Sequence, residues 1–157
     1  MSKSITHLGK LILIFFGGVA LFLAACQKEN KEDPQPTRKE LLVNKWTVSD
    51  VLEPGGSSVI NFPVPQITCL KDNIFTIAAN DTYTIDEGPV VCDPSSAGTG
   101  TWTLTANDTK LTFTPDGASD DPLVFTLIDV TGTTLKVSYE MTDIPLPGTY
   151  TIVLQKQ

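Results

Sequence analysis

Leu135-Lys136-Val137-Ser138-Tyr139-Glu140-Met141 is the stretch of this chain in which apolar and polar residues alternate most regularly. Successive side chains of a β-strand point to opposite faces of the sheet. The four apolar residues therefore share one face and the three polar residues share the other. A helix would instead place its apolar residues three or four positions apart. The heptapeptide predicts a strand with one buried side and one solvent-facing side.

The rest of the chain from Leu41 onward has the same character. Thr and Val are frequent there, both residue types favour strands, and no helical period of useful length is present. A short helical turn is expected only around residues 38–42. Strands are expected near residues 44–52, 73–78, 82–87, 99–105, 110–115, 122–130, 133–142 and 148–155.

The segments between these strands are typical of tight turns. Residues 79–82 and 106–109 both read Ala-Asn-Asp-Thr, and each lies between two predicted strands. Asn and Asp tolerate positive φ and bond to their own backbone, which suits a tight reversal. Residues 116–122 and 131–133 form the next two reversals. Neighbouring strands are therefore expected to pair as antiparallel hairpins.

A sheet built in this order would leave two exposed edges unless it closes on itself. Pairing residues 149–154 with the first strand, around Trp46, would remove both edges. The sequence therefore predicts an all-β fold, a small up-and-down antiparallel β-barrel of about eight strands. The apolar phase of the strands predicts these inward side chains: Trp46, Trp102, Phe113, Val137 and Leu154.

Two sets of motifs carry a family resemblance. Asn44-Lys45-Trp46-Thr47-Val48 resembles the start of lipocalins, with Asn44 where those proteins have Gly. An ordered set of short motifs then covers most of residues 41–157 and resembles the lipocalin-like domains of bacterial secreted lipoproteins, with Asp81 in place of the usual Gly. The resemblance implies the fold more than a function. The motifs are Cys69-Leu70-Lys71-Asp72-Asn73, Phe75, Asn80-Asp81-Thr82-Tyr83, Asp86-Glu87-Gly88, Cys92-Asp93-Pro94, Gly100-Thr101-Trp102 and Lys110-Leu111-Thr112.

The amino-terminal 25 residues have the features of a secretory signal peptide. Two lysines precede an apolar run over residues 11–25, which is too short for a comfortable membrane span. The run ends in Leu23-Ala24-Ala25-Cys26, which resembles a bacterial lipobox. The resemblance implies cleavage after Ala25 and acylation of Cys26, which would anchor the mature protein in a membrane.

Residues 26–40 are expected to be a lipidated, disordered tether. After Cys26 they contain no strongly apolar residue, so they cannot bury enough surface to offset the entropy of ordering. The opening Cys26-Gln27-Lys28-Glu29 resembles signals that send some lipoproteins to the outer face of the outer membrane. Surface exposure is therefore expected, with a periplasm-facing anchor as the alternative. Residues 41–157 form the predicted barrel domain.

Charge and histidine content exclude several functions. Removing residues 1–25 takes away two Lys and no acid, so the formal net charge changes from −7 to −9. This balance argues against nucleic acid, which needs a basic surface. His7, the sole histidine, also lies in the signal peptide. The mature chain therefore lacks the commonest general base and metal ligand, and neither a metal nor a cofactor is expected.

Cys69 and Cys92 remain once Cys26 is acylated. An exported protein reaches an oxidising compartment, where two thiols can form one disulfide. A disulfide between them would close a loop of about two dozen residues and stabilise the fold by roughly 3 kcal/mol. Two free buried thiols or a redox pair are the alternatives. A disulfide is favoured, because no Cys-x-x-Cys spacing lowers a thiol pKa.

The interior of the barrel decides between the candidate functions. An eight-stranded barrel is either just filled by side chains or holds one small ligand. The large inward aromatic residues favour a packed core slightly over an open pocket. If a pocket exists, its lining is expected to include residues from this set: Trp46, Phe75, Tyr83, Trp102, Phe125 and Tyr139.

The function expected from these features is binding or carrying a small, partly hydrophobic ligand without catalysis. The alternative is a packed surface module that binds another envelope protein or a host molecule. An enzyme would have to use acidic pairs such as Asp86 with Glu87 or Asp120 with Asp121. Neighbouring residues on a strand point to opposite faces, so such pairs need not share a site. No enzyme activity is expected.

Overall fold

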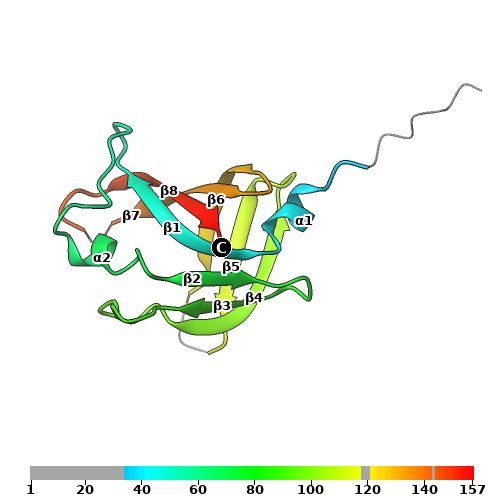
Figure 1. Ribbon diagram of the computed structural model, residues 1–157, viewed down its shortest axis with the longest axis horizontal. Coiled ribbons are helices and arrows are strands. Elements are labelled where there is room, and N and C mark those ends of the chain that lie inside the picture. The colour runs from blue at the N-terminus through cyan, green and yellow to red at the C-terminus, as the bar shows by residue number, and fades with distance from the viewer. Residues whose placement is uncertain (1–33, 118–120, 143) are drawn as a thin grey trace, which may run out of the picture. The chain divides into compact units, whose positions relative to one another are not determined.

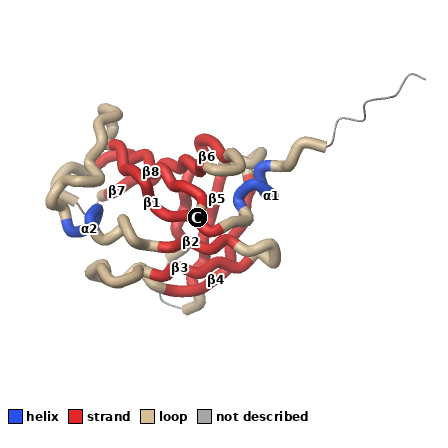
Figure 2. Tube along the Cα trace, viewed as in Figure 1, coloured by secondary structure: helices blue, strands red, loops and turns tan. Residues whose placement is uncertain are grey.

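The computed structural model describes residues 34–117, 121–142 and 144–157. The predicted signal peptide, Cys26 and most of the tether lie outside these residues. Within them the chain forms eight strands and two short helices (Figures 1 and 2). The elements are α1 (Arg38–Leu42), β1 (Lys45–Leu52), α2 (Pro65–Thr68), β2 (Ile74–Ile77), β3 (Thr82–Asp86), β4 (Gly98–Thr105), β5 (Lys110–Pro115), β6 (Leu123–Val130), β7 (Thr134–Met141) and β8 (Gly148–Lys156).

The strands form one closed barrel in which each strand pairs antiparallel with its neighbours in the chain and β8 pairs with β1. The predicted all-β barrel, its strands and the α1 turn are therefore confirmed, while α2 was not predicted. None of the helices in the described part of the chain is long and apolar enough to cross a membrane.

The strand of the opening heptapeptide shows how the alternation buries one face. In β7, Leu135 and Val137 are buried, whereas Lys136 between them is exposed. The two buried residues pair with Leu154 and Ile152 of β8, which are also buried. Cross-strand apolar pairs of this kind stabilise a sheet and hold its register.

Closure between β1 and β8 uses a β-bulge. Val48 pairs with Leu154 and Val51 pairs with Ile152, and the register shifts between Val48 and Asp50. The extra residue of a bulge lets two residues three positions apart point to the same face. Val48 and Val51 are both buried as a result.

One end of the barrel, called the closed end below, carries α1 and the β2–β3, β4–β5 and β6–β7 turns (Figure 1). The two Ala-Asn-Asp-Thr turns at this end differ in conformation. In the β2–β3 turn only Asp81 has a positive φ, of 61°, whereas the β4–β5 turn has three such residues in a row, Ala106, Asn107 and Asp108. The same four residues therefore form two different turns, although both reverse the chain as predicted.

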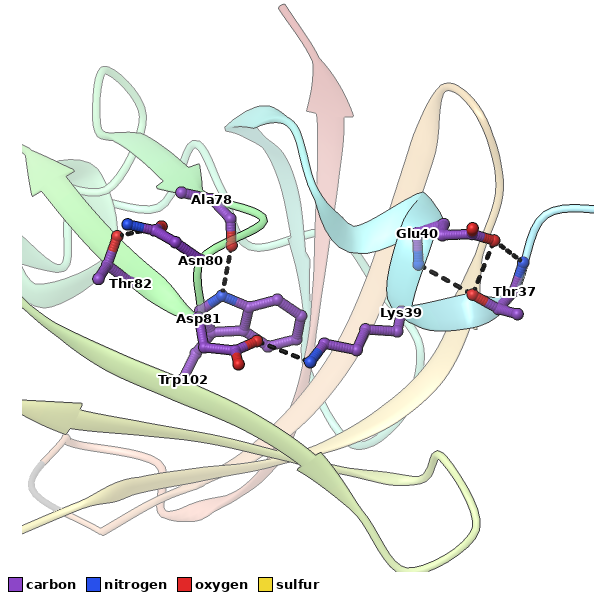
Figure 3. Close-up of polar contacts among 8 residues, drawn as sticks. All are labelled: Thr37, Lys39, Glu40, Ala78, Asn80, Asp81, Thr82 and Trp102. Atoms are coloured by element: carbon purple, nitrogen blue, oxygen red, sulfur yellow. Dashed lines mark hydrogen bonds and ion pairs between the residues drawn. The ribbon is translucent and has the colours of Figure 1, made fainter.

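Helix α1 is fastened to the closed end by its basic side chains. A capping box between Thr37 and Glu40 starts the helix. Lys39 Nζ lies 2.7 Å from Asp81 Oδ1 in the β2–β3 turn (Figure 3). Arg38 donates to the carbonyl oxygens of Asp108 and Ile128. The barrel domain therefore includes residues 37–40, which the sequence places in the tether.

Two indoles fill the barrel at this closed end. Trp46 donates from Nε1 to the carbonyl oxygen of Leu42, at 2.9 Å. Trp102 donates from Nε1 to the carbonyl oxygen of Ala78, at 3.0 Å, and Lys39 Nζ lies 5.3 Å from its ring centroid (Figure 3). Trp46, Trp102 and Leu42 are all buried, so this end of the barrel is sealed. The predicted inward set, Trp46, Trp102, Phe113, Val137 and Leu154, is buried throughout.

Candidate functional site

The opposite end of the barrel, called the open end below, leads into a cavity of about 320 Å³. The end consists of the long β1–β2 loop with α2, the β3–β4 loop, the β5–β6 loop and the β7–β8 loop. Leu70, Ser96 and Ile144 from three of these loops line the cavity together with inward residues of the strands. The slightly favoured prediction of a packed interior is therefore wrong.

One wall of the cavity is aromatic. The ring centroids of Phe113 and Phe125 lie 5.8 Å apart in an edge-to-face arrangement, and those of Phe125 and Tyr139 lie 4.9 Å apart with tilted planes. All three side chains line the cavity. Aliphatic residues make up most of the remaining lining, including Ile77, Ile85, Leu123, Leu135, Ile152 and Leu154. The cavity is thus suited to an apolar molecule.

Three of the six predicted binding residues, Phe75, Phe125 and Tyr139, line this cavity. Trp46 and Trp102 do not, because their indoles belong to the seal at the closed end. Strand alternation predicts whether a side chain points inward, but not its height along the barrel axis. For this reason the sequence alone does not distinguish the residues that line the cavity from those that seal the closed end.

Tyr83, the remaining predicted residue, packs into the core beside the cavity. Its ring meets Phe113 edge-on, with the centroids 4.9 Å apart. The ring also lies over Gly100, its cross-strand partner in β4. A Cβ atom at position 100 would come within 2.7 Å of the Tyr83 ring and would collide with the backbone oxygen of Thr114. Only Gly allows this close approach, which places the Tyr83 side chain in the wall of the barrel.

The Cys69–Cys92 disulfide, predicted from cysteine number and compartment, is present and spans 23 residues. It connects the end of α2 to the β3–β4 loop, beside the lining residues Leu70 and Ser96. It therefore holds together two of the loops that form the open end.

Glu87 organises the same region. Its carboxylate accepts hydrogen bonds from the Ser95 hydroxyl, from the backbone N–H and hydroxyl of Ser96, and from the backbone N–H of Cys92. These bonds, above all the one from Ser95, lower the pKa of Glu87 to about 2. The buried amide of Asn73 adds to the network: with its nitrogen facing the carbonyls, it donates to Cys69 and Glu87. Glu87 therefore stays ionised and holds the β3–β4 loop at the cavity.

The acidic pair of Asp86 and Glu87 does not form a shared site. Asp86 is exposed and accepts a hydrogen bond from the backbone N–H of Gly88, whereas Glu87 is buried in the loop network. The sequence gives Glu87 as a member of this pair and of the lipocalin-like motif Asp86-Glu87-Gly88, but does not predict its role in the loop. Its structural role depends on loop residues that follow no periodic pattern. In the described parts of the chain, no group of three or more His, Cys, Asp or Glu residues is placed to hold a metal ion.

A small closed antiparallel barrel, sealed at one end and hollow toward the other, is an architecture that can hold one small ligand inside the barrel. The family model of the lipocalin-like domain matches residues 42–137, and the chain belongs to this family of lipocalin-like domains. The matched segment extends from the last residue of α1 to the middle of β7 and includes the disulfide and the Glu87 network. The sequence matches no curated protein. Lipocalin-like barrels are generally binding folds and not catalytic ones.

Proposed function

We propose that this protein binds or carries a small, partly hydrophobic ligand in its barrel and does not catalyse a reaction on it. The cavity of about 320 Å³ with its apolar lining carries this proposal. Its volume lies at the lower end of the 300–1,000 Å³ typical of ligand pockets. A cavity of this size suits a short alkyl chain or a small ring system. The aromatic wall favours lipid-like or aromatic ligands over sugars or nucleotides.

The proposal also places the protein in the cell envelope as an outer-membrane lipoprotein. The lipobox-like Leu23-Ala24-Ala25-Cys26 and the polar residues 27–36 support this location. Acyl chains on Cys26 would hold the barrel at the membrane on its tether. The charged residues after Cys26 favour the outer face, with a periplasm-facing anchor as the alternative.

One observation favours a second function, a surface module that binds another envelope protein or a host molecule. Most of the large apolar side chains that are exposed in the described part of the chain lie at the open end. They are Phe62, Val90, Val91, Leu123, Val124 and Leu146. Exposed apolar residues gathered at one end of a domain are typical of contact surfaces.

Two tryptophan variants on β6 separate the cavity from this outer surface. Leu123 lines the cavity and is exposed at its opening, whereas its neighbour Val124 is exposed and does not line the cavity. Leu123→Trp should fill the cavity near its opening, and Val124→Trp adds the same bulk outside the barrel as a matched control. The mature chain, residues 26–157, would carry Cys26→Ser so that it can be purified without lipid.

The measurement is a titration with a neutral dye whose fluorescence rises in apolar surroundings. Mature protein and Val124→Trp should bind the dye saturably at one site, and Leu123→Trp should bind at least about tenfold more weakly. Equal binding by both variants would place the dye outside the cavity. Absence of saturable binding by the unmodified barrel would reject the carrier function and leave the surface module.

A further inference from the structure

Charged side chains are divided unevenly between the two ends of the barrel. By its loop or its half of a strand, each charged residue of the described segments lies nearer one of the two ends. The closed end then has six basic residues against four acidic ones, a formal net charge of +2. The basic residues are Arg38, Lys39, Lys45, Lys110, Lys136 and Lys156, and the acidic ones are Glu40, Asp81, Asp108 and Asp129.

The open end has nine acidic residues and a single Lys, a formal net charge of −8 among the described residues. Lys71, that single Lys, donates to the side-chain oxygen of Asn61, at 2.9 Å, and does not line the cavity. The acidic residues are Asp50, Glu53, Asp72, Asp86, Glu87, Asp93, Asp116, Asp121 and Glu140.

The cavity itself offers no positive charge to a ligand. No Lys or Arg is among the described residues that line it, and its few polar members are Gln66, Ser96, Tyr139, Glu140 and Thr142. An anionic head group would therefore meet no positive charge at the opening, and nine acidic residues of the described segments lie in the same half of the barrel. A cationic head group at the same position would be attracted by them, because clefts surrounded by one sign of charge concentrate ligands of the opposite sign.

We propose that the cavity selects cationic amphiphiles, molecules with an apolar body that fills the barrel and an ammonium-type head that stays at the open end. The binding site is the cavity, and the surrounding acids determine which head group it accepts. This inference rests on the proposed ligand-binding function and names the class of ligand that the site would take.

Three probes with the same ten-carbon chain test the selectivity: decylammonium, decanol and decanoate. Each would displace the neutral dye from the mature Cys26→Ser protein at pH 7, below its micelle concentration. Decylammonium should bind at least about tenfold more tightly than decanoate at about 10 mM salt, where the Debye length is ~30 Å. The difference between the two affinities should shrink at about 1 M salt, where the Debye length is ~3 Å. The affinity for uncharged decanol at each salt concentration corrects for the effect of salt on binding of the apolar chain.

Paired charge-removing variants locate the source of the preference. Asp93→Asn with Asp121→Asn removes two exposed negative charges at the open end that do not line the cavity, and Asp108→Asn with Asp129→Asn removes two at the closed end. The first pair should lower the preference for decylammonium over decanoate severalfold and leave decanol binding unchanged. The second pair should leave all three affinities unchanged.

The outcomes separate this inference from the function on which it rests. Binding of decanol together with equal or tighter binding of decanoate than of decylammonium would overturn the charge selectivity but keep the carrier. A preference that is independent of salt, or that both variant pairs reduce equally, would also overturn it. Failure of all three probes to displace the dye would overturn the carrier and the selectivity together.

Discussion

A single carboxylate, that of Glu87, fixes the β3–β4 loop beside the cavity. It accepts hydrogen bonds from three residues of that loop, and these bonds hold its pKa at about 2. An unfolded chain has no such bonds, so its glutamates titrate near 4.5. Folding therefore favours the ionised form of Glu87. Its contribution to stability is complete above about pH 4.5 and is lost as the pH falls from 4.5 to 2.

Replacing Glu87 by Gln should therefore lower the melting temperature by an amount that depends on pH. The amide keeps one acceptor oxygen and turns an N–H₂ group toward N–H and O–H donors, so part of the network is lost. Thermal unfolding measured from pH 7 to pH 2 should show a large difference between native protein and variant at neutral pH. The difference should shrink below pH 4.5.

Asp129→Asn, which neutralises an exposed carboxylate on β6, is the control and should follow the native protein across this range. A difference between Glu87→Gln and native protein that stays constant down to pH 2 would show that the charge of Glu87 does not support the loop.

Helix α1 is held to the barrel by the buried side chain of Leu42 and by the ion pair of Lys39, and one substitution at each position tests the two contributions separately. Leu42 is fully buried, so Leu42→Ala should cost about 2–5 kcal/mol of unfolding free energy. Lys39 forms an ion pair with half-exposed side chains, so Lys39→Ala should cost no more than about 1 kcal/mol. Denaturant unfolding of both variants measures the two effects. Equal, small losses would mean that α1 belongs to the tether and not to the domain.

At the scale of the elements, the disulfide between α2 and the β3–β4 loop is the strongest constraint on the open end. In the chain-entropy model, closing a loop of 23 residues contributes roughly 3 kcal/mol. Reduction, or replacement of both cysteines by Ser, should lower the melting temperature by several degrees. Calorimetry with and without reductant measures this. Two thiols that alkylate readily in non-reduced, exported protein would contradict the prediction.

Strands and loops differ in how far their sequences predict them. The strands are rich in Thr, Val and aromatic residues, several of them, such as β7, alternate apolar with polar residues, and the two Asn-Asp turns mark where the chain reverses. Composition, alternation and turn residues together therefore predict the strands to within about two residues. The residues of α2 and of the Glu87 network show no repeating pattern in the sequence. They form contacts between loops that lie far apart in the chain. No pattern within one segment of sequence carries that information.

The sequence predicts which side chains point into the barrel but not which of them line the cavity. Trp46, Tyr83 and Phe125 all lie on inward positions, but only Phe125 reaches the cavity. The first two fill the closed end and the wall of the barrel, and the cavity lies between them and the open end. Whether a barrel is packed or hollow depends on how its large residues are distributed along the axis. That distribution follows from the tilt and register of the strands, which the sequence does not display.

At the scale of the whole molecule, Cys26 should connect the barrel to a membrane. A lipobox presents this cysteine for acylation, so Cys26→Ser should yield a protein that no longer fractionates with membranes. The matched control is Gln27→Ser, which changes the neighbouring residue and should remain with the membranes. If the Cys26→Ser variant still partitions with membranes through residues 1–25, the lipoprotein anchor is wrong.

The central claim is that ligands bind inside the barrel at the open end, and methyl NMR tests it most directly. Titrating decanol into protein labelled at its Ile, Leu and Val methyl groups should shift the signals of Ile77, Ile85, Ile144 and Ile152, which line the cavity. Leu42 at the closed end and Val91 on the outer surface should keep their positions. Shifts confined to exposed methyl groups such as those of Val91 and Leu146, with the lining signals unchanged, would contradict the claim.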